Sequence, residues 1–250
     1  RSLIVTGVQT CALPILGDGR KLVRPEFDGP TLLDALDVAG EMPLPPYISE
    51  RLDDAERYQT VFSHRPASAA APTAGLHLTE RVLASLHERG VGIAEVELVV
   101  GLDTFRPLST DTVEEHQIHT ERYSVPDAAW DAVARTRANG GRVLAVGTTS
   151  VRALESRAAR GAPSGRTDLF ITPGFRFRAV DVMLTNFHMP RTSLLALVQA
   201  FIGPRWRDLY ATALDERYRF LSFGDAMLLR RDDRVAHDDG TPHPPHRGAP

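Results

Sequence analysis

Short apolar runs alternate with helical patterns along most of the chain, and one junction between them carries unusual chemistry. The apolar run Val143–Val146 ends at Gly147, and a helical pattern begins at Val151. Three hydroxyl residues lie between them: Thr148, Thr149 and Ser150. The pattern predicts a strand, a tight turn and the N-terminus of a helix. Backbone N–H groups at such a terminus bind anions well. The alternative is that Thr149 or Ser150 only caps the helix.

Other segments continue the alternation. Apolar patterns predict strands at Glu95–Val100, Asp168–Thr172 and Ala179–Leu184. A helix capped by Thr79 is expected at Glu80–Arg89, and a helix that is apolar almost all round is expected at about Thr192–Ile202. Short strands that alternate with helices predict an α/β fold with mixed strand pairing.

The composition limits the kinds of functional site that the chain can form. The 250 residues are 42% hydrophobic, enough for a substantial core, and the net charge of −3 confines any RNA contact to a local patch. Lys21 is the only lysine, which argues against a Schiff-base or phosphate-loop lysine. The single Cys11 excludes a disulfide framework and a multi-cysteine zinc site, and it suits a reducing, cytoplasmic setting. No apolar run reaches the ~18 residues that a membrane helix needs.

Three further segments hold candidate functional residues. Small residues surround Thr73 and Gly75 in Ala67–Leu78, which ends in His77 and Leu78. The sequence TNFHMP, Thr185–Pro190, follows a predicted strand and precedes the apolar helix. His116, His119 and Glu121 form H-x-x-H-x-E, which could bind a metal, although the pattern H-E-x-x-H of catalytic zinc sites is absent. An ordinary hydrogen-bonding role for these histidines is the favoured interpretation.

Taken in order, seven motifs resemble one family. They are MPLPPYI, AAPTAGLH, TFRP, H-x-x-H-x-E, AVGTTSVRALES, TNFHMP with its apolar helix, and YRFLSFGDAM. Together they resemble the S-adenosylmethionine:tRNA ribosyltransferase-isomerases of queuosine biosynthesis, from about Asp28 to Leu229. The resemblance implies a mixed-sheet, barrel-like main domain at residues 41–229. It also implies a remnant of a small β domain at residues 16–40.

The chain departs from the family pattern in two places. A sizeable N-terminal part is missing and residues 1–15 match none of it, so we expect a truncated or artefactual start. Where relatives show His and Gly in H-V-G-x-G-T-F, this chain has Val99 and Asp103. The tail at residues 230–250, charged and rich in proline, is expected to be disordered.

The resemblance implies an unusual use of S-adenosylmethionine as co-substrate. Its ribosyl carbons are transferred to a 7-aminomethyl-7-deazaguanine at the tRNA wobble position, adenine and methionine leave, and epoxyqueuosine remains. A base must remove a proton from the ribose 5′ carbon, for which His188 is the first candidate and His77 and His119 are rivals. Negative charge or an aromatic face near the sulfonium is expected from Asp181, Glu121, Phe105 or Phe187.

The remaining expected contacts are with the methionine carboxylate and the RNA. Thr148, Thr149 and Ser150 would bind the carboxylate, with Arg152 one turn further on, and Asn186 would offer an amide to a base edge. Arginines that alternate with aromatic residues are candidate RNA contacts: Arg176, Arg178, Arg217 and Arg219. The same alternation is typical of a half-buried strand, which is the slightly favoured interpretation for Arg176 and Arg178.

Two other functions stay open at this point. One is a metal-dependent hydrolase built on His116, His119 and Glu121. The other is an inactive, truncated RNA-binding remnant. The leading hypothesis predicts an enzyme with tRNA as partner, no metal, no membrane association and a monomeric state.

Overall fold

The computed structural model describes residues 31, 34, 35, 38, 44–50, 52–64, 68, 70–100 and 120–232. The predicted 1–15 segment lies outside the described residues, as do most of 16–40 and nearly all of the predicted tail. The described elements, in chain order, are η1 (Ala55–Tyr58), η2 (Thr73–His77), α2 (Glu80–Glu88), β1 (Glu97–Val99), β2 (Glu121–Ser124), α3 (Asp127–Ala138), β3 (Leu144–Val146), α4 (Thr148–Arg160), β4 (Ser164–Thr167), β5 (Val182–Asn186), α5 (Ser193–Ile202), η4 (Gly203–Arg205), α6 (Trp206–Asp215) and β6 (Ala226–Arg230).

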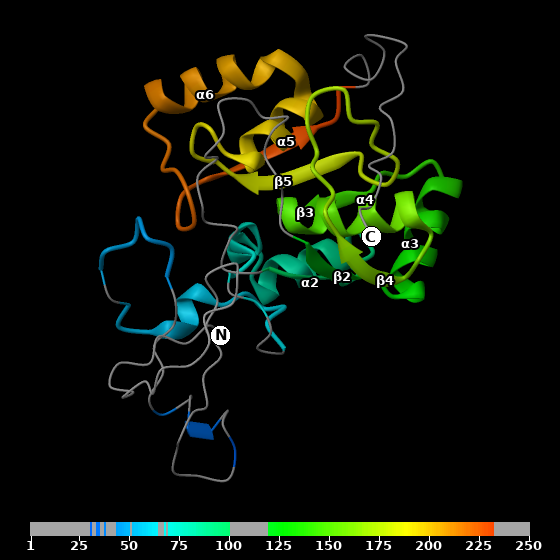
Figure 1. The fold of residues 1–250 in the computed structure, drawn as a ribbon, viewed down its shortest axis with the longest axis horizontal. Helices are drawn as coiled ribbons and strands as arrows, with labels where there is room; N and C mark the ends of the chain where they lie inside the picture. The colour runs from blue at the N-terminus through cyan, green and yellow to red at the C-terminus, as the bar shows by residue number, and fades with distance from the viewer. Residues whose placement is uncertain are drawn as a thin grey trace, which may run out of the picture.

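The described strands form two small sheets (Figure 1). One is antiparallel, in the order β1-β2-β4. The other has the order β3-β5-β6, in which β3 runs parallel to β5 and β6 runs antiparallel to it. The mixed α/β class is therefore confirmed. These described strands do not close into a barrel.

Helix α4 contacts strands of both sheets and joins them into one core. Val151 and Ala153 are fully buried within it, and Leu154 is nearly so. Helix α5 is buried through Leu197, Val198 and Phe201, as its apolar pattern predicts, and Thr192 caps it by accepting the N–H of Leu195 at 3.3 Å. Burial of each such side chain stabilises the fold by about 1.5–3 kcal/mol.

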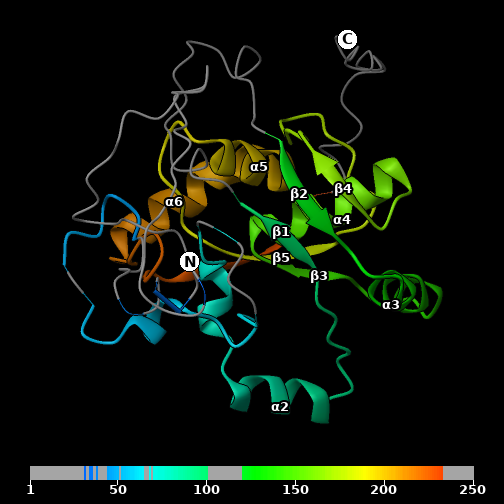
Figure 2. The ribbon, with the colours of Figure 1, turned by 60° about the horizontal axis from the view of Figure 1, so that its bottom comes forward.

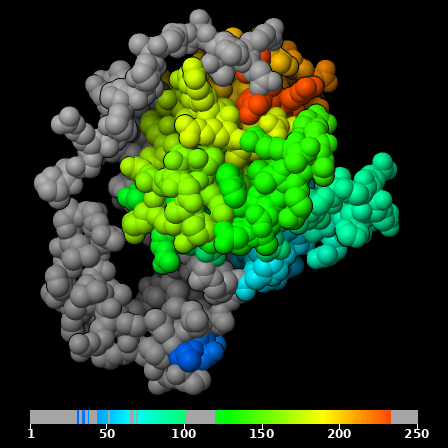
Figure 3. Space-filling model, turned by 90° about the vertical axis from the view of Figure 1, so that its right-hand side faces the viewer, coloured from blue at the N-terminus to red at the C-terminus, as the bar shows by residue number. Residues whose placement is uncertain are grey.

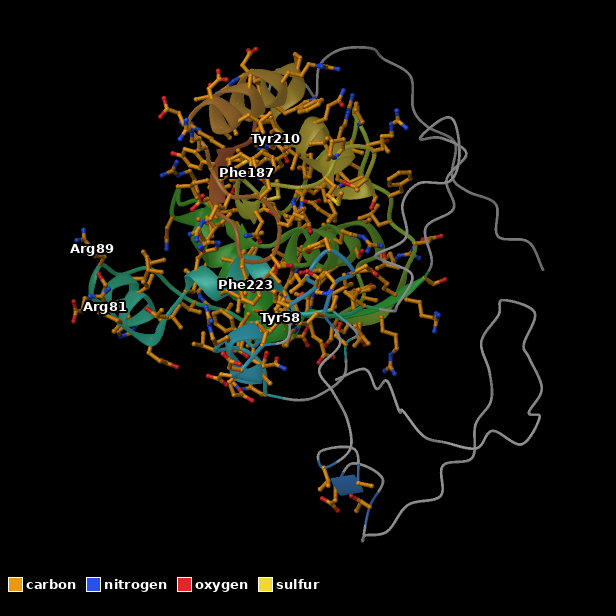
Figure 4. All side chains as sticks on the ribbon, turned by 90° about the vertical axis from the view of Figure 1, so that its left-hand side faces the viewer. Tyr58, Arg81, Arg89, Phe187, Tyr210 and Phe223 are labelled. Atoms are coloured by element: carbon orange, nitrogen blue, oxygen red, sulfur yellow. The ribbon has the colours of Figure 1, made fainter. Side chains whose placement is uncertain are left out.

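An aromatic cluster fixes the segment that follows β5. Phe187 is 2% exposed, and its ring meets those of Tyr210 and Phe220 at centroid distances of 5.3 and 4.9 Å. Figure 4 shows Phe187 and Tyr210 together inside the body of the molecule. Because these rings come from the residue after β5, from α6 and from the segment before β6, the cluster holds the end of β5 in a fixed position.

Helix α2 lies apart from both sheets (Figure 2). Thr79 caps it as predicted, by accepting the N–H of Val82 at 3.3 Å, but no residue of α2 is buried. None of the helices in the described part of the chain is long and apolar enough to span a membrane.

Two predicted elements differ in the structure. Asp168–Thr172 is not a strand, and the strand in this region is β4, just before it and shortly after the end of α4. Strand β4 forms because it pairs with β2, and the hydroxyls of Ser156 and Thr167 share a buried hydrogen bond of 2.6 Å. Helix α4 also begins at Thr148, three residues before the predicted Val151.

Candidate active site

Parallel pairing places two of the predicted corners side by side. Val146 at the end of β3 is in register with Leu184 on β5, and Gly147 donates its N–H to the Leu184 carbonyl at 2.8 Å. Because parallel strands present their carboxyl ends at one edge, the turn at Gly147 and the corner after Asn186 share this edge. We call it the carboxyl edge.

The turn at Gly147 leaves the start of α4 without a side-chain cap. Gly147 is the N-cap residue, with φ 86° and ψ 149°, a conformation that is almost restricted to glycine. Within the described residues no side-chain hydrogen bond caps the first turn of α4, so the capping role considered for Thr149 or Ser150 is not seen. The Ser150 hydroxyl instead donates back to the Val146 carbonyl at 2.8 Å. This terminus therefore has the polarity of an anion-binding site.

The small-residue segment joins the same edge. A Cβ added to Gly147 would lie 3.8 Å from the Cβ of Ala74 in η2. Thr73 donates its hydroxyl to Oδ1 of Asn186 at 3.1 Å, and Nδ2 of Asn186 lies 3.3 Å from Nε2 of His77. Three motifs that are far apart in sequence thus meet at the carboxyl edge.

Asn186 is the centre of this arrangement, since its amide links three segments. Besides Thr73 and His77 on η2, it reaches the carbonyl of Asp225, at 3.5 Å, just before β6. Asn186 is 3% exposed, and the amide makes these bonds within the protein. These bonds join three segments of the chain through Asn186, and its contact with a base edge stays a prediction.

His188 lies one residue beyond Phe187 at the same corner. Its Nε2 is 2.9 Å from the Thr185 hydroxyl, and its backbone N–H donates to the Tyr210 hydroxyl at 2.9 Å. Burial lowers the pKa of His188 from 6.5 to about 4. The imidazole is therefore neutral at pH 7 and retains a nitrogen that can accept a proton.

The proline-rich segment packs against the SFGDAM corner. Tyr47 shares a hydrogen bond of 2.7 Å with Ser222, and the Tyr58 ring contacts Phe223 edge-on at 5.5 Å (Figure 4). Burial raises the pKa of Tyr58 to about 12, so it stays protonated. A Cβ at Gly224 would lie 2.4 Å from the Arg219 carbonyl oxygen, so only glycine fits this turn.

Comparison with known proteins agrees with this convergence of motifs. A family model described as queuosine biosynthesis protein matches residues 5–229. The chain belongs to this family. The match reaches the predicted end at Leu229 and begins earlier than the motifs alone predict.

Individual relatives of the queuosine biosynthesis family carry a more specific name. S-adenosylmethionine:tRNA ribosyltransferase-isomerase from an Azoarcus strain is 54% identical over 228 residues, which cover 88% of this chain and 66% of that protein. The same enzyme from Thiobacillus denitrificans is 51% identical over 226 residues, 88% of this chain and 65% of that protein. This chain thus spans slightly less than two thirds of the length of these relatives.

A crystal structure of S-adenosylmethionine tRNA ribosyltransferase from Thermotoga maritima has a similar fold. It matches with a TM-score of 0.53 and 43% identity, over 62% of this chain and 50% of that one.

Two predicted ligand residues of this family member are engaged elsewhere. Arg152 forms an ion pair with Glu121 on β2 and donates from Nε to the Leu169 carbonyl at 3.1 Å. The two side chains are only 12% and 7% exposed. The guanidinium thus joins α4 to β2 through Nε and Nη1, while its buried Nη2 has no hydrogen-bond partner among the described residues. Contact of Arg152 or Glu121 with S-adenosylmethionine stays a prediction. The ring of Phe187 is packed in the aromatic cluster, and its contact with the sulfonium stays a prediction.

Asp181 lies at the opposite edge of the sheet. It precedes β5, accepts the N–H of Val143 at 3.0 Å, and pairs with Arg137 and Arg231 at 3.6 and 3.5 Å. A strand of five residues rises about 16 Å, which separates Asp181 from the carboxyl edge. We therefore do not place it near the sulfonium.

The predicted RNA-contacting arginines divide between the two edges. Arg176 and Arg178 are exposed and precede β5, while Phe175 and Phe177 between them are half-buried, as the alternation predicts. Arg217 and Arg219 are exposed near the carboxyl edge, where Arg219 pairs with Asp225 at 3.9 Å. Phe105, His116 and His119 lie outside the described residues. Among the residues that are described, no cluster of potential metal ligands occurs.

Sequence reasoning missed the residues that support the corner. Thr185, Tyr210 and Ser222 orient His188 and Tyr47, yet nothing in their local patterns indicates these partners. The sequence did offer one indication of the contact between η2 and Gly147. Ala74, a small residue inside AAPTAGLH, allows η2 to approach Gly147 closely.

Proposed function

We propose that this protein catalyses the reaction for which its relatives are named, the transfer and isomerisation of the ribosyl group of S-adenosylmethionine on tRNA. The acceptor is a 7-aminomethyl-7-deazaguanine at the wobble position, and the product is epoxyqueuosine. The observation that carries the proposal is the meeting of the Thr73–His77, Gly147–Ser150 and Asn186–His188 segments at one edge.

The N-terminus of α4 suits the carboxylate of the methionine portion. Its uncapped N–H groups and partial positive charge favour an anion, and Thr149 lies beside Gly147, with its hydroxyl 3.4 Å from a Cβ placed there. Thr148 is 7% exposed and contributes mainly its backbone. Arg152 is not required for this contact.

The same edge supplies two histidines for proton transfer. Removing a proton from the 5′ carbon requires an unprotonated base, and the lowered pKa keeps His188 in this form at neutral pH. His77 is exposed on η2, and Asn186 holds one of its ring nitrogens. We assign His188 as the base and His77 to the departing adenine, which needs a proton as it leaves.

Adenine release tests both the activity and the roles. The chain is incubated with S-adenosylmethionine and tRNA bearing the 7-deazaguanine precursor, and free adenine is quantified. We expect release that depends on the tRNA and falls at least ~100-fold in His188→Ala and His77→Ala. His87→Ala on the exposed face of α2 is the matched control and should retain the parent rate. Absence of adenine release from the parent chain, with tRNA still bound, would favour the RNA-binding remnant.

The proposal includes the setting of the reaction. Residues 41–229 would act as one catalytic domain, and the contacts of α4 with both sheets support a shared core. The protein would act as a monomer on the anticodon loop, in the cytoplasm, where tRNA and S-adenosylmethionine are found, and without a metal.

A further inference from the structure

A basic cavity lies at the edge opposite the candidate active site. Its volume is about 270 Å³. Four arginines and one aspartate line it, together with Gly140 and Gly141: Arg137, Arg142, Arg230, Arg231 and Asp181. Figure 3 shows the end of β6, in red, at the surface beside the segment that runs from α3 to β3, in green.

The charges of this cavity do not balance. Asp181 is shared between Arg137 and Arg231, and one of its oxygens also accepts a backbone N–H. Arg142 and Arg230 are exposed, and neither forms an ion pair with any residue in the described part of the chain. The lining thus carries a surplus of positive charge in a protein whose net charge is −3.

Arg231 is held rigidly within the lining. Its guanidinium donates to the carbonyls of Val180 and Phe177 at 3.0 and 3.4 Å, in addition to its pair with Asp181. The contact with Phe177 brings the exposed Arg176 and Arg178 to the neighbourhood of the cavity. A pre-organised guanidinium group surrounded by further arginines is typical of oxyanion recognition, because arginine offers paired donors to phosphate.

Strand β6 connects this cavity to the candidate active site. It starts beside Asp225, which Asn186 contacts, and ends at Arg230. Leu228 and Arg230 share one face of the strand and are both exposed, Leu228 to 66%. Five residues rise about 16 Å, the length of about five nucleotides in a stacked strand at ~3.4 Å each.

We propose that this cavity binds a backbone phosphate of the tRNA, a few nucleotides away from the base that is modified. The inference rests on the proposed function for the identity of the RNA. Arg142 and Arg230 make the contact, and Arg137 and Arg231 hold the site in shape. An RNA strand would follow the exposed face of β6 from Arg219 at the carboxyl edge to Arg230.

The salt dependence of tRNA binding tests this assignment. Each phosphate contact contributes ~0.7–0.9 to the slope of log K against log salt concentration. R142A/R230A removes this one phosphate contact and should therefore reduce the slope by about 0.7–0.9, which lowers affinity at ~0.1 M salt about 5- to 8-fold if affinity at 1 M is unchanged. R142K/R230K keeps the charges and should retain most of the slope.

The matched control is R81A/R89A, which removes one exposed arginine on α2 and one at its C-cap (Figure 4). This variant should keep the parent slope. An equal loss in both double alanine variants would mean a general effect of charge and would overturn the assignment. An unchanged slope in R142A/R230A, with adenine still released by the parent chain, would overturn it while leaving the proposed function intact.

A free phosphate ion is the alternative ligand for this cavity, because it presents the same oxygens as a phosphate of the RNA backbone. Inorganic phosphate is therefore titrated while the melting temperature is followed. Phosphate that stabilises the parent but not R142A/R230A, combined with equal tRNA slopes, would assign the cavity to a small anion and contradict the RNA contact. Failure of the parent to bind tRNA or release adenine would overturn the proposed function, and this inference with it.

Discussion

Replacing Asn186 with alanine tests whether one amide holds the carboxyl edge together. The substitution removes the bond from Thr73 at 3.1 Å, the bond to His77 at 3.3 Å and the longer contact with the Asp225 carbonyl at 3.5 Å. A net contribution of about 1 kcal/mol for each good hydrogen bond, and little for the longest, gives about 2 kcal/mol. The gap left by a side chain that is 3% exposed raises the expected loss to about 2–3 kcal/mol.

Urea denaturation measures this loss, and a double-mutant cycle locates it. Asn186→Ala, Thr73→Val and the double variant are compared, and a coupling energy of about 1 kcal/mol is expected for the Thr73–Asn186 bond. Asn139→Ala at the exposed end of α3 is the matched control, with an expected change within about 0.5 kcal/mol. Adenine release should also fall in Asn186→Ala, because His77 loses its fixed orientation. Additive single effects in the cycle would refute the bond between these two side chains.

Four further expectations follow from individual contacts. Burial lowers the pKa of His188 to about 4, so the unfolded chain, in which the pKa is near 6.5, binds a proton at this side chain more tightly than the folded chain does. The free energy of unfolding is therefore highest above pH ~6.5 and falls by at most about 3 kcal/mol as the pH drops towards 4. His188→Gln should flatten this part of the curve of unfolding free energy against pH. Glu121→Leu or Arg152→Met alone should cost about 3–5 kcal/mol in urea titrations, since each removes one half of a buried ion pair, and the double variant should cost less than the sum. Glu155→Ala should cost about 4 kcal/mol, because the buried carboxylate accepts three backbone N–H groups at 2.8–3.0 Å; a loss below ~1 kcal/mol would contradict this role. Gly147→Ala should cost about 1–3 kcal/mol and weaken S-adenosylmethionine binding, whereas Gly161→Ala, also at positive φ but in open space, should affect stability alone.

Elements with strong local signals could be predicted from the sequence. The apolar pattern of α5 and the caps at Thr79 and Thr192 depend on residues within one or two turns, and the structure confirms all three. Strand β4 could not be found in this way. Its sequence, SGRT, has little strand propensity, and it is a strand because β2 pairs with it from some 40 residues away.

Two contacts near the candidate site could not be predicted for the same physical reason. Arg152 follows the anion-binding turn by one helical turn, but its partner Glu121 lies 31 residues earlier and no local pattern reveals that pairing. Asp181 was placed within a strand predicted at Ala179–Leu184, and the observed start at Val182 moves it to the opposite edge. A boundary shift of three residues thus moves this carboxylate from the middle of the strand to a position just before its first residue.

The two edges of the β3-β5-β6 sheet therefore differ in the polar groups that they present, which the sequence alone does not reveal. At the carboxyl edge the proposed anion site is formed by backbone N–H groups, and Asn186 bonds to the neutral Thr73 hydroxyl and the Asp225 carbonyl. At the other edge arginines exceed carboxylates in the lining of the cavity. Fixed dipoles at the reacting edge suit a reaction that moves a sulfonium charge, because nearby guanidinium groups would repel that charge. Arginines about 16 Å away can still attract RNA phosphates, so we expect R142A/R230A to raise the KM for tRNA and to leave kcat near the parent value.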